Sequence, residues 1–375
     1  MIYLDNSATT FPKPECLYDA LDNANRHHAF NAGRGTYKYA RETFEIIKKT
    51  RIAIAKLIDA NSDNVSFFSS ATEALNLIVN GLEIEKGDNI YISPFEHNAI
   101  VRPLFNLKKE IDFNILFLPF DKITWELDTK KLENMFAVNN PKAVLISHVS
   151  NVTGYILPYQ GIFSLSKKYR AINVLDCAQS FGILNPNKEN CDFIVFAGHK
   201  SLYASFGVAG FINVNDFKLK ITKSGGNGAD SLNHDMPTSG YERYEAGSIN
   251  SVAICGLNAS LKWLSSENIL EKEKKLWQYM IYKMVRNKKL ILYLPKNYDN
   301  ILGIVSFNVI GYKANDVGSI LSDEYDICVR TGYHCCPFIH DFLNSLKYGG
   351  TIRISLGAFN TKSDIDILVD ALNTL

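Results

Sequence analysis

The sequence predicts an α/β protein built on a mainly parallel sheet. Short runs, several of them almost wholly apolar, recur along the first two thirds of the chain, which is typical of strands buried on both faces of such a sheet. Helical patterns lie between some of these runs, for example at 160–170. Alternating strands and helices favour right-handed crossover units. The predicted strands are 89–93, 113–117, 143–148, 172–176, 193–197 and 210–214.

The length and a change of pattern near residue 260 predict two domains. A chain of 375 residues is too long for one small domain. A charged helical stretch at 266–289 follows "INSVAICGLNASLKWL", and shorter elements come after it. We expect 15–259 to form the large domain, and 1–14 with 260–375 to form the small one. The turn-rich "TTFPKP" segment is expected to pack beside the small domain or across the entrance of the site.

Composition and charge narrow the classes of partner. The chain has 40 basic and 39 acidic residues, which gives no reason to expect nucleic acid or an anionic membrane as the main partner. The start, "MIYLDNSATT", lacks the pattern of a signal peptide, and no run reaches the roughly 18 apolar residues of a membrane helix. The 7 scattered cysteines do not form a disulfide framework, so a reducing cytoplasm is expected.

The stretch "VSFFSSATEALNLIVNGL" predicts a strand that runs into a helix. Small and hydroxyl-bearing residues occupy the turn: Ser69, Ser70, Ala71 and Thr72. Ser70 and Glu73 have the spacing of a capping box. Free N–H groups and hydroxyls at a helix start favour an anion site, although a well-capped helix alone would explain the pattern.

Two further strand ends carry reactive groups, and ligands of open α/β sheets bind at such ends. In "INVLDCAQS", Asp176 ends a buried strand and Gln179 follows it. A carboxylate there needs a partner, which a protonated pyridine nitrogen, a salt bridge or a helix cap could each supply. In "FIVFAGHKSLYASFGVAGF", Lys200 follows a strand directly. Partial burial would make it a usable amine, whereas exposure would leave an ordinary loop lysine.

The order and spacing of these segments resemble the class V aminotransferase family of pyridoxal-phosphate enzymes. Within it, the chain is similar to cysteine desulfurases and selenocysteine lyases, and its C-terminal part is most similar to the short-loop desulfurases. The resemblance implies fold type I and pyridoxal 5'-phosphate as cofactor. The similar segments are "YLDNSATTFPKP", "NAGRGTYKYA", "SSATEALN", "EHNA", "SNVTGYILP", "DCAQS", "AGHKSLY", "GGNGADS", "YEAGSIN", "RTGYHCC" and "TIRISLGAFNT".

The resemblance implies four roles around the cofactor ring. Lys200 would bind the cofactor covalently through its amine. Asp176 would pair with the pyridine nitrogen and keep the ring an electron sink. Gln179 would hydrogen-bond the phenolic oxygen, and His97 would stack on the ring and move protons.

The resemblance also implies how the phosphate would be held. Ala71 and Thr72 would contact it, helped by His199. Ser248 matches a position that reaches the phosphate from a neighbouring subunit, which implies a homodimer with shared sites. Three features depart from the family pattern: Ala197 stands where a hydroxyl residue is usual, Ser248 replaces threonine, and "LYASFG" lacks Gly-Pro. The first of these puts cofactor affinity in question, but not cofactor identity.

The substrate end is assigned by the same resemblance. Asn151 and Arg353 would hold the carboxylate of L-cysteine, Arg353 through a two-pronged ion pair, and Arg330 would lie beside them. In "RTGYHCC", Cys335 takes the position of the nucleophile. Its thiolate, favoured by Arg330 and His334, would attack the substrate sulfur and leave alanine and an enzyme persulfide.

Other interpretations of the cysteine segment stay open. Cys335 would be a small buried residue if it were not the nucleophile. Cys336 is either a harmless small residue, a second sulfur carrier or a redox guard. A disulfide between adjacent cysteines is strained. His334, Cys335, Cys336 and His340 also suggest a metal site, but the C-x₂-C pair typical of zinc is missing, and no metal is predicted.

The function predicted from the sequence is therefore that of a cysteine desulfurase, a sulfurtransferase of the cytoplasm. A compact cysteine loop implies a nucleophile that moves little. A small sulfur-acceptor protein is therefore expected to take the persulfide sulfur from the enzyme. The alternatives are a selenocysteine lyase, a cystine or cysteine C–S lyase that forms pyruvate, an aminotransferase or epimerase, and a non-catalytic protein with a decayed cofactor site.

Overall fold

A seven-stranded sheet forms the centre of the computed structural model, which describes residues 1–33, 35–228 and 232–375. Its strand order is β2-β8-β7-β6-β5-β3-β4, and β7, β6, β5, β3 and β4 run parallel. The α/β prediction is confirmed, and no predicted strand is displaced by more than two residues. The strands are β2 Val65–Phe68, β3 Asn89–Ile92, β4 Asn114–Phe117, β5 Pro141–Ser147, β6 Ile172–Asp176, β7 Phe193–Ala197 and β8 Ala209–Asn213.

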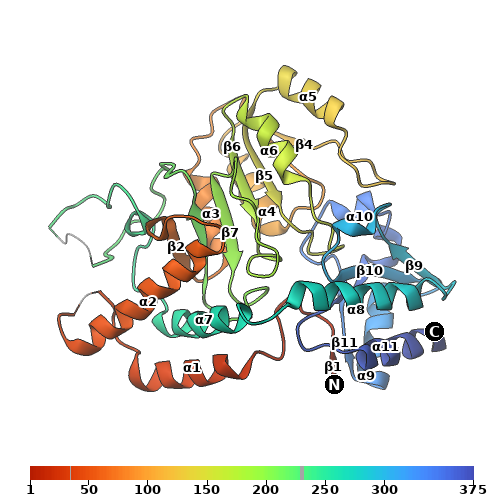
Figure 1. The fold of residues 1–375 in the computed structure, drawn as a ribbon. Helices are drawn as coiled ribbons and strands as arrows, with labels where there is room; N and C mark the ends of the chain where they lie inside the picture. The colour runs from red at the N-terminus through yellow and green to blue at the C-terminus, as the bar shows by residue number, and fades with distance from the viewer. Residues whose placement is uncertain (34, 229–231) are drawn as a thin grey trace.

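Both faces of this sheet are buried, as the apolar runs predict. Val144 and Ile146 point into one hydrophobic cluster, whereas their neighbours Ala143 and Leu145 point into the cluster on the opposite face. Helices cover both faces (Figure 1), and the predicted helix at 160–170 is α6. These helices are α1 Glu15–His27, α2 Lys38–Lys56, α3 Ala71–Gly81, α4 Asn98–Leu107, α5 Thr129–Val138, α6 Tyr159–Lys167 and α7 Ser251–Leu264.

The C-terminal part of the chain has its own four-stranded antiparallel sheet, in the order β12-β13-β10-β9. The N-terminal strand β1 (Ile2–Tyr3) pairs in parallel with β11 (Ile327–Cys328), so the chain start lies against this part (Figure 1). The helix α7 packs in a cluster with the large sheet, whereas α8 packs mostly with the small one. The division at residues 259/260 stays a prediction. The remaining elements are α8 Ile269–Met284, β9 Leu290–Tyr293, β10 Ile304–Val309, α9 Ala314–Tyr325, β12 Arg330–Gly332, α10 Ile339–Phe342, β13 Thr351–Ser355 and α11 Lys362–Thr374.

Two of the similar segments fall partly outside the described residues, namely Arg34 of "NAGRGTYKYA" and 229–231 of "GGNGADS". Among the helices that the structure describes, none has the length and apolar composition to span a bilayer.

A buried ion pair joins α2 to the loop before α7. Arg51 donates through both terminal nitrogens to Glu245, at 2.7 and 2.6 Å, and Glu245 also accepts from the N–H of Phe67 at 2.6 Å. The guanidinium lies 3.7 Å from the ring centre of Tyr241. The two charged side chains are only 5% and 6% exposed, so neither can turn to water if its partner is removed.

Replacing Arg51 by methionine is therefore expected to lower the free energy of unfolding by about 3–5 kcal/mol, because Glu245 would stay buried without its countercharge. Denaturant unfolding of the purified apoprotein measures the change. The matched control is Arg26→Met, since Arg26 pairs with Asp22 at 67% and 65% exposure and its loss should lower the free energy of unfolding much less. Equal stability losses in the two variants would contradict the prediction.

Candidate active site

The candidate site lies where five strands end on one edge of the large sheet. The strand β2 runs in the same direction as β7, because Phe68 and Ala197 both pair with Ala209 of the antiparallel β8. The loops after β2, β3, β5, β6 and β7 therefore meet, as expected for open α/β sheets. Eight of the predicted residues line one cavity there: Ala71, Thr72, His97, Asn151, Asp176, Gln179, His199 and Lys200.

Lys200 and Asp176 are set at the ends of adjacent strands. Burial lowers the pKa of Lys200 to about 8, Arg353 and Arg330 act in the same direction, and Asp176 opposes them. Asp176 is buried, and it accepts a hydrogen bond of 2.9 Å from the N–H of Ala178. Burial raises the pKa of the Asp176 carboxyl, which makes a cationic partner favourable at this point.

The start of α3 supplies free backbone N–H groups at the cavity. The Ser70 hydroxyl accepts from the N–H of Glu73 at 3.1 Å and caps the helix. The predicted capping box is wrong in its second half, because the Glu73 carboxylate accepts from the N–H of Ser69, at 3.0 Å, instead of that of Ser70. Ala71 and Thr72 open the helix and line the cavity, an arrangement that suits an anion.

His199 faces the same cavity and is held in place by the N-terminal segment. Its ring stacks on Phe206 with 4.6 Å between centroids, and its carbonyl accepts from the N–H of Thr10 at 3.1 Å and from Nζ of Lys13 at 2.8 Å. Burial lowers the pKa of His199 to about 3, so the ring is neutral. Its Nδ1 is buried and has no hydrogen-bond partner among the described residues, which leaves this atom for a ligand.

His97 caps α4, and its orientation is fixed by the backbone. Its Nδ1 accepts from the N–H of Ala99 at 3.0 Å. Burial, followed by the nearby charge of Lys200, lowers the pKa of His97 to about 3. The ring is therefore neutral and carries its proton on Nε2. Gln179, across the cavity, donates to the carbonyl of Ser7 at 3.0 Å.

Glu96 is a buried carboxyl that the sequence analysis left without a role. It accepts from the N–H of Ser147 at 3.0 Å and from its hydroxyl at 2.8 Å, and it also contacts the Ser93 hydroxyl. Burial raises the pKa of Glu96 to about 7. Its position four residues after the end of β3, in "EHNA", was the available signal.

Two arginines lie opposite one another on neighbouring strands of the small sheet. In the register of β12 and β13, Arg330 pairs with Arg353, so the two cations are adjacent. Arg353 is buried and donates to the Asn151 carbonyl at 2.8 Å and to the Asp5 carboxylate at 2.5 Å. Its Nε is buried and has no partner among the described residues, and Arg353 does not line the cavity that holds Lys200. No role was predicted for Asp5 from the sequence.

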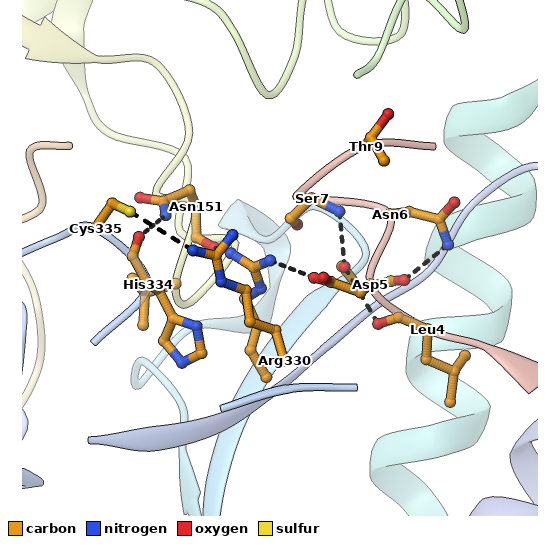
Figure 2. A network of polar contacts seen from close by, with 12 residues as sticks. Leu4, Asp5, Asn6, Ser7, Thr9, Asn151, Arg330, His334 and Cys335 are labelled. Carbon is orange, nitrogen blue, oxygen red and sulfur yellow. Dashed lines mark hydrogen bonds and ion pairs between the residues drawn. The ribbon is translucent and has the colours of Figure 1, made fainter. Parts of the chain in front are cut away.

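The cysteine segment follows β12 directly. Cys335 is exposed, which excludes the buried interpretation, and its Sγ lies 3.5 Å from Nη2 of Arg330 (Figure 2). The expectation that His334 adds positive charge is wrong. Its Nε2 bonds to Thr351 at 2.9 and 3.0 Å, and burial lowers the pKa of the ring well below its ordinary value. In residues 1–33, 35–228 and 232–375, no cluster of His, Cys, Asp or Glu could hold a metal ion.

Ser248 lies apart from the other predicted residues. It is exposed and lines a second cavity, of ≈ 520 Å³, beside α2 and the buried Arg51–Glu245 pair. It does not line the cavity that holds Lys200.

The large sheet with its smaller C-terminal sheet has the fold type I architecture that was predicted. The chain belongs to the class V aminotransferase family, since the model described as "Aminotransferase class-V" matches residues 2–368. It is 30% identical over 388 residues to a probable cysteine desulfurase of Pyrococcus abyssi, covering 100% of this chain and 94% of that protein. A cysteine desulfurase of Wigglesworthia glossinidia brevipalpis is 31% identical over 396 residues, covering 99% and 92%.

A solved structure supports the same assignment. The apo structure of a cysteine desulfurase from Thermococcus onnurineus NA1 is similar with a TM-score of 0.91 and 27% identity, covering 100% of this chain and 94% of that one.

Proposed function

We propose that this protein is a pyridoxal-phosphate-dependent cysteine desulfurase that converts L-cysteine to L-alanine and stores the sulfur as a persulfide on Cys335. The observation that carries the proposal is the exposed thiol of Cys335, 3.5 Å from Arg330, on a segment anchored to the mouth of the cavity. The N–H of Asn98, next to His97, donates to the Cys335 carbonyl at 2.7 Å. A nucleophile is thereby fixed beside the candidate cofactor site.

The residues of the cavity fit pyridoxal phosphate. The start of α3 and the unpartnered Nδ1 of His199 suit its phosphate, and Asp176 suits its ring nitrogen. Lys200 offers an amine whose pKa of about 8 makes the neutral, nucleophilic form accessible. When bound, the cofactor would supply an electron sink for negative charge at Cα of the substrate. Ala197 brings no hydroxyl, so the phosphate would depend on the remaining donors.

The substrate carboxylate would be held by the arginines. Arg353 is oriented by Asp5 and by the carbonyl of Asn151, and its buried Nε–H has no partner among the described residues, which supports a role in binding the carboxylate. Arg330 pairs with Arg353 in the register of the small sheet and also contacts the sulfur of Cys335, so it links the two. Lys200, as a neutral amine, can take and return the proton at Cα.

The sulfur transfer balances without a further reactant. The Cβ–S bond of L-cysteine breaks while an S–S bond forms between the substrate sulfur and Sγ of Cys335. The thiol proton of Cys335 is replaced by the persulfide bond, and Cβ of the product gains one proton to give L-alanine. A sulfur acceptor must then remove the persulfide, and the exposure of Cys335 supports delivery to a small acceptor protein.

The same proposal extends to assembly and location. Ser248 is exposed and outside the cavity of its own subunit, which supports a homodimer in which it reaches the partner's phosphate. All 7 cysteines are free, which supports the reducing cytoplasm as the compartment.

The lowered pKa of Lys200 predicts how cofactor capture depends on pH. The rate at which the apoprotein takes up added pyridoxal phosphate should rise with pH and level off above about 8, because the neutral amine is the reacting form. Asp176 raises the pKa of Lys200, so Asp176→Asn should move the midpoint to lower pH. Rates from the visible absorption band between about pH 6.5 and 9.5 test this. A wild-type rate that still climbs tenfold per pH unit above 9 would contradict it.

The proposed function is tested by brief exposure of the enzyme to L-cysteine without reductant, followed by peptide mass spectrometry. Alanine and pyruvate are assayed in parallel. One sulfur added to the Cys335 peptide, with alanine as product, is the expected result. Pyruvate without added sulfur would indicate a C–S lyase, and neither product would direct attention to aminotransferase substrates. Repeating the assay with L-selenocysteine separates a selenocysteine lyase.

A further inference from the structure

Cys336 stands next to the proposed nucleophile, yet it differs from Cys335 in every contact. Its side chain is 0% exposed, and its Sγ–H donates to the carbonyl of Glu96 at 3.1 Å. A residue enclosed in this way cannot meet a substrate or an acceptor thiol. Burial also raises the pKa of the Cys336 thiol well above its ordinary value, so it stays protonated. A second sulfur carrier would need the opposite properties.

We propose that Cys336 is a positioning residue, whose buried side chain fixes the backbone of the loop that presents Cys335. The inference rests on the proposed function for the meaning of Cys335, but it concerns the geometry of the loop itself.

The loop adopts a backbone conformation that must be stabilised by contacts with the surrounding residues. His334 and Cys335 have φ angles of 48° and 56°, and Gly332, two residues before His334, has a φ angle of 93°. Positive φ is uncommon in residues with a Cβ, and two such residues in succession persist only when their surroundings hold them. This conformation buries the ring of His334 while it turns the thiol of Cys335 outward.

Besides the bonds of His334 to Thr351, each residue of the turn has an anchor in the segments around Asn151 and Glu96. The side chain of Asn151 donates to the His334 carbonyl at 2.8 Å, and the N–H of Asn98 donates to the Cys335 carbonyl at 2.7 Å. Cys336 contributes the third anchor through Glu96. Of the three, only the Cys336 contact uses a side chain of the loop itself.

The anchor on Glu96 joins the loop to a rigid point of the site. The Glu96 carboxylate is fixed by both donors of Ser147, and the next residue is His97. The Cys336 side chain also packs in the large hydrophobic cluster with Ile339 and Phe342. These contacts fix the position of Cys335 relative to His97 and to Arg330, and the sulfur of Cys335 contacts Arg330.

The test compares Cys336→Ala, which removes the donor, with Cys336→Ser, which keeps one. The control is Cys191→Ala, since Cys191 is also fully buried and donates to a backbone carbonyl, that of Asn187, at 3.8 Å outside the site. Thermal unfolding and cofactor absorption are recorded for all three. The first readout is the rate at which iodoacetamide alkylates Cys335 at pH 7, followed on its peptide. The second is the single-turnover rate of persulfide formation.

We expect Cys336→Ala to slow persulfide formation about tenfold with an unchanged KM, since a loop shifted by about 1 Å loses reactive geometry. Alkylation of Cys335 should slow by about threefold, because a released thiol leaves its contact with the guanidinium of Arg330. Cys336→Ser should restore most of both rates, and Cys191→Ala should change neither.

Unchanged rates in Cys336→Ala, equal losses in Cys191→Ala, or sulfur assigned to Cys336 by fragmentation of the peptide that carries both cysteines would each overturn the proposal. The alkylation readout needs no turnover. If the wild-type enzyme formed no persulfide, the proposed function would fail, while the positioning role of Cys336 would still be measured.

Discussion

Lys200→Ala is expected to lose both the visible absorption of lysine-bound pyridoxal phosphate and the formation of alanine from L-cysteine. Turnover should fall by more than about 10³-fold, because the substitution removes the covalent anchor and the group that moves the Cα proton. Lys200 lies at the end of β7, within a cavity that lowers its pKa to about 8. Absorption spectroscopy and an alanine assay on the same preparation measure the two losses.

The matched control is Lys223→Met. Lys223 also approaches the start of α3, where it pairs with Glu73 at 2.9 Å, but it is 52% exposed and lies outside the cavity. This variant should keep the absorption band and most of the turnover. If Lys200→Ala retained the band, or more than about a tenth of the turnover, another residue would have to hold the cofactor.

Cys335→Ala is expected to abolish persulfide formation and to reduce alanine production to below about 1% of the wild-type rate, while the absorption of the bound cofactor is unchanged. The two effects separate because Cys335 does not line the cavity that contains Lys200. Mass spectrometry of the exposed protein and the product assay measure both. The expected loss is large because the sulfur has no other nucleophile to accept it.

Cys16→Ala provides the comparison for Cys335→Ala, since Cys16 is a partly exposed thiol on α1 outside the site. It should behave as the wild type. Wild-type alanine production by Cys335→Ala would refute the assignment of the nucleophile. Pyruvate formed equally by both variants would instead identify a lyase in which Cys335 has no chemical role.

The large sheet could be predicted from the sequence because strands that are buried on both faces consist of consecutive apolar residues. The strands β6 and β7 were predicted with their observed ends, and Asp176 and Lys200 follow from those ends. Roles within the site came from the resemblance of the motifs to a family, because no local pattern distinguishes a reactive lysine from a solvated one.

What the sequence did not indicate depends on contacts between distant segments. Asp5 and Arg353 are 348 residues apart, and Cys336 meets Glu96 across 240 residues. Neither contact produces a hydrophobic periodicity or a motif spacing that could be recognised in the sequence. The expected electrostatic role of His334 was wrong for the same reason, since its ring is buried and bonds to Thr351 on β13.

The contacts of the N-terminal segment couple the two proposed binding sites thermodynamically. Within nine residues it contacts the arginine proposed for the substrate, through Asp5, and the carbonyl of His199 at the proposed phosphate site, through Thr10 and Lys13. A ligand that alters this segment at one end alters the free energy of binding at the other. Such coupling is reciprocal, so any factor by which the cofactor changes the affinity for an amino-acid carboxylate must equal the factor by which that carboxylate changes the affinity for the cofactor.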